Sequence, residues 1–474
     1  MTILPINPAT NANPDTLRAF LEQCREAAAR AGRPKLVSIS LAVDALDPLA
    51  VLESIFDPGE PHFYAERPDI ESAIAGAETA LAFAAEGGDR FAAVQRWIDE
   101  TLEHTIAVGD VNAPFGGPHF FASFAFADNV EAGEAFPAAR VFVPRWQVAR
   151  AGAVTTAVAN LTVAPDADLA ALTERVWRAH AKFSGFRYRE PAPAETTATI
   201  PTVFTQREAQ DYRSAVGAAL ERIGAGEFDK IVLARAQDLA AALPLHPLRV
   251  LNGLRQRFPD CYAFSLANGR GQSFIGASPE RLVRVSKGVL ETEALAGSTR
   301  RGAGASDDAA LAAALLRSEK DRREHAHVLQ AIADRLAQLG LKPEFVPEPG
   351  LRRLANVQHL HTPVRAALPE GVRLLATLAA LHPTPAVGGT PLAAAVAAIR
   401  GLEGFPRGLY AGALGWLNAR GGGEFFVGLR SALIDGATAR VYAGAGIVAG
   451  STPEKEFAET DLKFKAMLEA LTTS

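Results

Sequence analysis

Short apolar segments separated by glycine-rich turns are the pattern that most constrains this chain. Between Gly408 and Val448 the sequence reads GLYAGALGWLNARGGGEFFVGLRSALIDGATARVYAGAGIV, which predicts consecutive strands joined by tight turns. Upstream, SFIGASPERLVRV and GVLETEALAG flank Ser286-Lys287-Gly288, where glycine permits the backbone of a hairpin turn. With helical segments inserted between groups of strands, the pattern predicts an α+β fold with largely antiparallel sheets rather than a doubly wound one.

A Pro/Ala/Thr-rich stretch at 190–202 divides the chain. It separates an N-terminal segment, 1–195, of mixed strands and helices from a C-terminal region, 203–474. The periodicity of apolar residues predicts helices at 91–105, 205–223, 247–257, 306–339 and 371–380, and a helix that closes the chain. The Ala-rich segment AIAGAETALAFAA, 73–85, is also predicted to be helical.

Composition excludes several classes of protein. The 474 residues are 48% hydrophobic and 21% charged, with a formal net charge of -5, which is typical of a globular protein and gives no basic surface for nucleic acid. Cys24 and Cys261 have no CxxC or Cys/His spacing, so neither a disulfide framework nor a zinc site is expected. The sequence has no basic leader before an apolar run and no long uncharged apolar segment, which predicts a cytoplasmic protein without a membrane partner.

One lysine lies in an apolar strand. Lys230 begins KIVLAR, and alternation places it on the face of Val232 and Ala234 while Ile231 and Leu233 take the other face. If both faces are buried, the lysine is desolvated, loses proton affinity and can act as a general base. The alternative is an edge-strand lysine that faces water.

Three acids are candidates for a partner of this base. Glu280 follows Pro279 at the end of a predicted strand, where a fixed turn would aim it at a cleft, although an ordinary loop acid fits the same pattern. Glu291 and Glu293 lie on the next strand, and periodicity does not choose among the three.

Two predicted helices carry acids at the margins of their apolar stripes. Glu324 borders the stripe of the helix in 306–339, and Glu456, Glu459 and Lys463 border that of the last helix. If these edges face one another, the carboxylates form a site for a hard divalent ion. Solvated acids with i,i+4 partners are the alternative.

An arginine and a run of small residues complete the set. Arg430 lies within the apolar segment FFVGLRSAL and needs an anion, either a structural acid or the carboxylate of a ligand. Gly444 and Gly446 lie in AGAG, where exposed N–H groups are able to hold a carboxylate, although a tight bend of the sheet explains the glycines equally well.

The C-terminal region carries seven motifs in this order: GASPERL, EALAGSTRRG, SEKDRREHAHVL, LHPTPAVGGTP, RGLYAGALGW, GEFFVGLRSA and AGAGIVAGSTPEKEFAETDLKFKAM. With these motifs the chain resembles the chorismate-utilising enzymes, which comprise isochorismate, salicylate, anthranilate and aminodeoxychorismate synthases. In the N-terminal segment, FYAERP resembles the FYWE-x-P motif of isochorismate synthases, with Ala65 in place of tryptophan. The resemblance implies one intertwined α+β fold with two large, mainly antiparallel sheets surrounded by helices.

The resemblance also implies a reaction and its residues. Lys230 stands where members that add water at ring carbon 2 have a lysine, which implies a magnesium-dependent isochorismate synthase with chorismate as substrate and no glutamine amidotransferase subunit. Lys230 would be the base, and Glu280 would be the acid that protonates the hydroxyl leaving carbon 4. Glu324 and Glu459 would bind Mg²⁺, with Glu456 acting through water. The residues implied in substrate binding are Gly297, Ser298, His382, Tyr410, Arg430, Gly444, Gly446 and Lys463.

Some alternatives stay open at this point. His382, in the HPTP motif, either orients the substrate or has a structural role at a helix end. A salicylate synthase, which eliminates pyruvate from isochorismate, shares the acid, the base and the metal ligands. An inactive homologue acting as a binding subunit is disfavoured because the charged residues needed for the reaction are present. The product would feed menaquinone, siderophore or other biosynthesis.

Overall fold

The computed structural model describes residues 1–4, 13–184, 203–354 and 357–473. The N-terminal part contains β1 (Thr2–Ile3), α1 (Pro14–Ala31), β2 (Lys35–Val43), α2 (Pro48–Ser54), β3 (Pro61–Arg67), the short 3₁₀ helix η1 (Pro68–Ile70), β4 (Ser72–Ala85), α3 (Arg90–Glu103), β5 (Thr105–Gly109), β6 (His119–Phe124), β7 (Ala139–Ala151), β8 (Val154–Val163) and α4 (Leu169–Ser184). The segment 190–202, expected to separate the two regions, lies outside the described residues.

The C-terminal part begins with β9 (Thr205–Glu208), α5 (Tyr212–Gly224), β10 (Lys230–Ala240), α6 (Pro247–Arg257), β11 (Tyr262–Asn268), β12 (Gln272–Ser278), β13 (Arg281–Ser286) and β14 (Val289–Arg300). It continues with α7 (Ala305–Arg317), α8 (Glu319–Gln338), β15 (Gly350–Arg353), β16 (Val357–Ala367), α9 (Leu374–Leu381), β17 (Gly389–Thr390) and α10 (Leu392–Glu403). It ends with β18 (Ala413–Asn418), β19 (Gly423–Val427), β20 (Ser431–Asp435), β21 (Thr438–Val448) and α11 (Pro453–Thr472).

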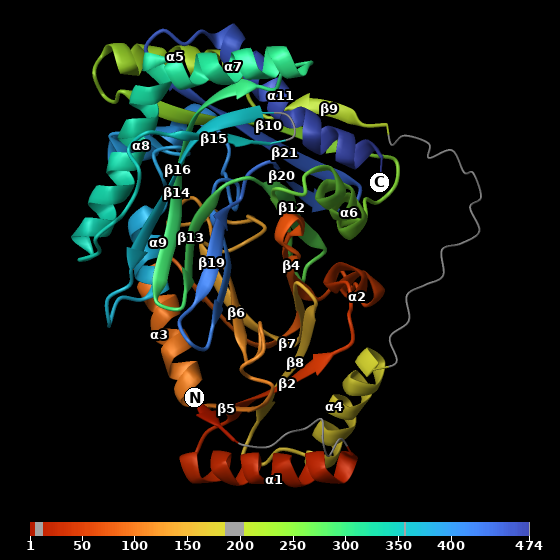
Figure 1. Ribbon diagram of the computed structural model, residues 1–474. Coiled ribbons are helices and arrows are strands. Elements are labelled where there is room, and N and C mark those ends of the chain that lie inside the picture. Colours follow the sequence, from red (N-terminus) through yellow and green to blue (C-terminus); the bar gives the residue numbers. More distant parts are fainter. Residues whose placement is uncertain (5–12, 185–202, 355–356, 474) are drawn as a thin grey trace.

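Antiparallel ladders dominate the architecture, so the α+β expectation is confirmed. Among the described pairings only β1–β5 and β2–β5 are parallel. The two sheets expected are linked into one network, because β3 pairs with β11 and β6 pairs with β18 across the two parts of the chain. In Figure 1, α5, α7 and α11 lie together at one end of the molecule and α1 lies at the opposite end.

The hairpin predicted at 286–288 is present. Ser286 pairs with Val289, and Lys287 and Gly288 both have positive φ, 51° and 75°. Two consecutive left-handed residues form the turn whose twist matches that of the flanking strands.

The Ala-rich segment 73–85 is a strand, so the predicted helix is wrong. It forms most of β4, which pairs with β3 on one side and β7 on the other. The helix preference of alanine amounts to less than about 1 kcal/mol per residue. It is outweighed by the ladder with β7 along the whole strand and by the ladder with β3 over 72–77. Packing also selects small residues here, because a Cβ at Gly76 would lie 2.4 Å from the Phe121 ring.

Two predicted helices differ from the structure, one in its interior and one at its start. The helix expected at 306–339 is two helices, because Ser318 ends α7 and caps α8 by accepting the Asp321 N–H. The start of the helix expected at 205–223 is strand β9, which pairs with β10.

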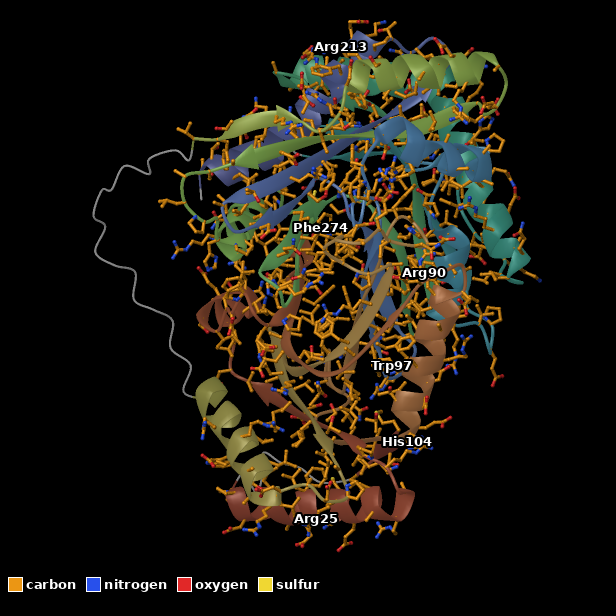
Figure 2. All side chains as sticks on the ribbon, turned by 180° about the vertical axis from the view of Figure 1, so that it is seen from behind. Arg25, Arg90, Trp97, His104, Arg213 and Phe274 are labelled. Carbon is orange, nitrogen blue, oxygen red and sulfur yellow. The ribbon has the colours of Figure 1, made fainter. Side chains whose placement is uncertain are left out.

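The core joins both parts of the chain. Phe63 and Phe121 from the N-terminal part share one buried cluster with Phe264 and Phe426. Phe274 also belongs to this cluster, and Figure 2 shows it in the middle of the molecule, between Arg213 near one end and Arg25 at the other. None of the helices in the described ranges is long and apolar enough to cross a membrane.

Candidate active site

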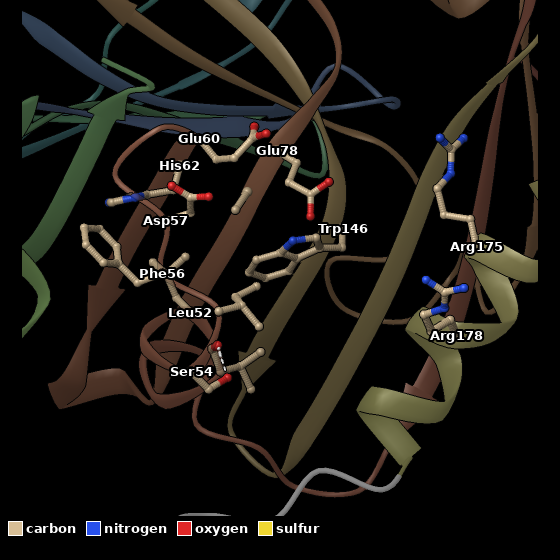
Figure 3. A pocket seen from close by; sticks show the side chains of 13 residues that line it. Leu52, Ser54, Phe56, Asp57, Glu60, His62, Glu78, Trp146, Arg175 and Arg178 are labelled. Atoms are coloured by element: carbon tan, nitrogen blue, oxygen red, sulfur yellow. Dashed lines mark hydrogen bonds between the residues drawn. The ribbon is translucent and has the colours of Figure 1, made fainter. Parts of the chain in front are cut away.

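Two cavities of the molecule are candidate sites. The first, of about 340 Å³, is lined by every site residue predicted from the sequence except His382. The second, of about 560 Å³, lies between α2, β3, β4, β7 and α4, with Trp146 at its centre and Arg175 and Arg178 on one side (Figure 3). Its charged groups include pairs satisfied on the protein, such as Glu78 with Arg145 and Arg178 with Glu174. We therefore identify the first cavity as the candidate active site.

Lys230 is held between the sheet and α8. As the first residue of β10 it pairs with Val448 of β21 and Thr390 of β17, and its side chain is 12% exposed. Its Nζ donates to Glu324 Oε1 at 2.5 Å. The position is neither an exposed sheet edge nor fully buried, and the amine lines the cavity in an ion pair.

Glu280 lies in the short connection between β12 and β13. Its backbone is fixed there, because its N–H donates to Ser278 Oγ at 3.3 Å and its carbonyl accepts from Val427 N–H at 3.0 Å. Burial raises the pKa of Glu280 to about 7, and the negative charge of Glu293 adds to this, whereas Arg352 and Lys230 oppose it. A carboxyl group that titrates near neutrality is suited to general acid catalysis.

The other two acids that periodicity allowed are occupied. Glu291 forms an ion pair with Arg365 at 3.0 Å, and Glu293 with Arg352 at 2.8 Å. Neither lines the cavity. Among the three, only Glu280 is placed to contact a ligand there.

Arg430 is a partly buried cation that lacks an ion-pair partner in the described part of the chain. It lies between β19 and β20 with φ 46°, and its Nη1 has no hydrogen-bond partner there. Burial lowers the pKa of Arg430, and Cys261 and Asp260 only partly oppose this. Of the two anions expected from the sequence, no structural acid is paired with Arg430 among the described residues. Arg430 lines the cavity, where a ligand carboxylate would meet its guanidinium.

The glycines at 444 and 446 make room for side chains. A Cβ at Gly446 would lie 3.0 Å from Lys230 Cε, and one at Gly444 would lie 2.7 Å from Tyr410 Oη. The hydroxyl of the buried Tyr410 therefore approaches β21 where only glycine leaves space, and burial raises its pKa.

The backbone near these glycines faces away from β10. Val232 and Ala234, which are opposite Gly446 and Gly444, donate their N–H groups to Gly388 O and Glu403 Oε1 instead of to β21. Val232–Gly446 and Ala234–Gly444 are therefore non-hydrogen-bonded pairs of the antiparallel ladder. The N–H groups of Gly444 and Gly446 point away from β10, toward the opposite edge of β21. In the described structure β20 pairs with β21 only as far as Tyr442, so that side is open to the cavity.

Acids from α8 and α11 line the same cavity, as the stripe positions predicted. Glu324 comes from α8, and Glu456 and Glu459 come from α11. Glu459 accepts from Lys463 Nζ at 2.7 Å, and the same amine donates to Gly444 O at 2.7 Å. Burial raises the pKa of Glu456, and the charge of Glu459 adds to this.

These acids have the chemistry of a magnesium site. Three carboxylates supply hard oxygen ligands, and the repulsion felt by Glu456 is what a cation relieves. Within the described ranges no three ligating side chains are gathered around one point, and Glu324 and Glu459 are each paired with a lysine.

A bulge in β14 shapes the opposite wall. The register with β16 shifts between Leu295 and Ser298, and Gly297 has φ 79°, which favours glycine. Ser298 Oγ and His359 Nδ1 are 2.6 Å apart.

His359 is a site residue that sequence reasoning missed. It lines the cavity, its Nε2 is buried with no partner in the described part of the chain, and burial lowers its pKa to about 3. A histidine in a strand has no distinguishing local signal. Only its register opposite Ser298 in the β14–β16 ladder identifies it.

His382 lies away from the cavity. It is the C-terminal cap of α9, and its ring packs near Phe91 and Phe126, with centroid distances of 6.1 and 6.4 Å. Burial lowers its pKa to about 3. Of the two alternatives for His382, the arrangement favours the structural role at the helix end.

Comparison with known proteins agrees with this geometry. The family model described as chorismate binding enzyme matches residues 19–472. The chain belongs to this family. It is 38% identical to the salicylate biosynthesis isochorismate synthase of Pseudomonas aeruginosa, over 96% of this chain and 94% of the relative. It is 32% identical to the isochorismate synthase MenF of Bacillus subtilis, over 92% and 93%.

Solved structures of the family share the fold. The menaquinone-specific isochorismate synthase MenF of Escherichia coli is similar with a TM-score of 0.77 and 29% identity, covering 95% of this chain and 99% of that one. Component I of anthranilate synthase from Streptococcus pneumoniae, at 22% identity and a TM-score of 0.67, shares the fold. The α+β architecture is therefore that of chorismate-binding enzymes.

Proposed function

We propose that this protein is an isochorismate synthase, which adds water at ring carbon 2 of chorismate and releases the hydroxyl from carbon 4. The observation that carries the proposal is one cavity lined by Lys230, Glu280 and Arg430, a cation without an ion-pair partner among the described residues. Relatives named isochorismate synthase that align over nearly the whole chain support it.

The cavity suits a dianion. Arg430 would bind the pyruvyl carboxylate, together with Tyr410 Oη and the N–H groups of Gly444 and Gly446. These donors lie at the open side of β21, where no described strand competes for them. Gly297, Ser298 and Lys463 would line the side of the ring carboxylate, and His359, beside Ser298, adds a neutral imidazole there.

The proton transfers require a base and an acid. Lys230 would first leave its ion pair with Glu324 and release its extra proton to solvent. The neutral amine would then take a proton from the water whose oxygen bonds to carbon 2. Glu280 would give its proton to the hydroxyl that leaves carbon 4. A carboxyl group with a pKa of about 7 retains a protonated fraction at neutral pH, which an ordinary glutamate lacks.

Glu324, Glu456 and Glu459 would hold the magnesium ion. Bound there, the ion would neutralise the ring carboxylate of chorismate. The fit rests on the three carboxylates that line one cavity and on the charge repulsion at Glu456. We infer that the enzyme is cytoplasmic. We also infer that it acts without an amidotransferase subunit, because water and not ammonia would be the nucleophile.

The test is product analysis by chromatography. Purified protein with Mg²⁺ and chorismate is expected to form an isomer of the same mass without ammonia, and to convert isochorismate back. Salicylate and pyruvate as the main enzymatic products would instead make it a salicylate synthase. Absence of any magnesium-dependent turnover would favour the inactive binding subunit.

A further inference from the structure

A second carboxylate lies buried behind the proton donor. The Glu293 side chain, on β14, is 3% exposed and lies outside the cavity. Arg352 Nη1 contacts its Oε1 at 2.8 Å, His361 Nε2 contacts its Oε2 at 2.9 Å, and the backbone N–H of Arg281 donates to Oε1 at 3.2 Å. The Arg281 guanidinium is 3.7 Å away.

These donors keep Glu293 ionised. Burial alone would raise the pKa of Glu293, but the hydrogen bond from His361 and the charges of Arg352 and Arg281 hold it at about 2. The donor residue Arg281 directly follows Glu280 in the chain, so the anion is tied to the backbone that carries the proton donor.

We propose that Glu293 is a positioning residue that acts through Glu280: its fixed negative charge keeps the proton on the catalytic acid. This inference rests on the proposed function, since it assumes that Glu280 is the acid. Apart from its role in packing, a buried anion at this position opposes the two cations that would otherwise strip Glu280 of its proton, Lys230 and Arg352.

The charged groups that act on Glu280 fall into two sets with opposite effects on its proton. Lys230 on β10 and Arg352 on β15 favour its carboxylate form, whereas burial and Glu293 on β14 favour its acid form. Tyr410, which is also coupled to Glu280, stays neutral because burial raises its pKa. Glu293 is therefore the one negative charge in the described structure that acts on Glu280 in the direction the reaction needs.

The experiment compares Glu293→Gln with Glu291→Gln, using the pH dependence of kcat/KM. Glu291 lies two residues away on the same face of β14 and is ion-paired with Arg365, but it does not act on Glu280, so it is a matched control. In the parent, the plot of kcat/KM against pH should change slope near pH 7, where Glu280 titrates; we call this change of slope the bend. In Glu293→Gln the bend should move to lower pH by about one unit, the usual size of such effects in folded proteins. Glu291→Gln should leave it in place.

The shift should be the same for chorismate and for isochorismate as substrate, because the equilibrium constant fixes the ratio of the two kcat/KM values at every pH. Arg352→Gln, which removes an opposing cation, should move the bend to higher pH and gives a second test if Glu293→Gln fails to fold. Infrared difference spectra against Glu280→Gln follow the Glu280 carboxyl without turnover. They separate this inference from the proposed function.

A folded Glu293→Gln protein whose bend and carboxyl titration match the parent would overturn the proposal. Equal shifts in Glu293→Gln and Glu291→Gln would also overturn it, because the effect would then be one of net charge. A uniform loss of rate at every pH with an unmoved bend would assign Glu293 a structural role. If instead chorismate is not turned over but the carboxyl shifts as expected, the proposed function fails and the coupling stands.

Discussion

Replacing Arg430 with methionine should make the ligand-free protein more stable and the enzyme worse. Arg430 is partly buried, its Nη1 is fully buried and unsatisfied in the described structure, and no ion pair there compensates the guanidinium. A buried polar group without a partner costs about 1–3 kcal/mol, which methionine of similar length would recover. With about 2.1 cal/mol/K per residue of unfolding entropy, a chain of 474 residues converts this into a rise in Tm of roughly 1–3 °C.

The same change should remove the anchor of the substrate carboxylate. Hydrogen bonds to a charged group contribute about 1.5–3 kcal/mol, so KM for chorismate should rise roughly 10- to 150-fold. The assays are a thermal melt without ligand and steady-state kinetics on the same preparation.

Arg407 provides the matched control. It is more deeply buried than Arg430, at 5% exposure, but its guanidinium is satisfied by Glu403 and by the carbonyl oxygens of Val387 and Val232. Arg407→Met leaves the buried Glu403 carboxylate without its ion-pair partner. It should lower the free energy of unfolding by about 3–5 kcal/mol. If Arg430→Met also lowers Tm and leaves KM unchanged, Arg430 is a structural cation and the binding argument is refuted.

Three further changes test the rest of the site. Lys230→Gln should lower turnover by about 10²–10⁴ in both directions with the fold retained, and near-parental rates in a folded protein would return Lys230 to a structural role. Glu324→Gln and Glu459→Gln should each shift the Mg²⁺ titration of activity to higher concentration. Glu469→Gln should not, because Glu469 lies on the same helix as Glu459 but is paired with Lys465. Identical titrations for all three variants would contradict the metal assignment. Gly446→Ala places a Cβ 3.0 Å from Lys230 Cε and should lower kcat about tenfold or more by displacing the amine, so an unchanged kcat would mean that the lysine position is not critical.

Sequence alone determined the features that depend on neighbours in the chain. The hairpin at Lys287 and Gly288 follows from the residues that tolerate positive φ. The carboxylates at the margins of two apolar stripes follow from helical periodicity, and Glu324 and Glu459 do meet at one cavity. The motifs and their order also indicate the chorismate-binding family without any knowledge of the geometry.

Tertiary structure alone decided what depends on partners distant in sequence. The segment 73–85 is a strand because β3 and β7 pair with it, which its alanine content could not reveal. Glu280 and Glu293 have the same chemistry, but one faces the cavity and the other is enclosed by Arg352 and His361. Protonation and reactivity follow from burial and from nearby charges, and folding brings those charges together from strands up to about 120 residues apart, as with Lys230 and Arg352 around Glu280.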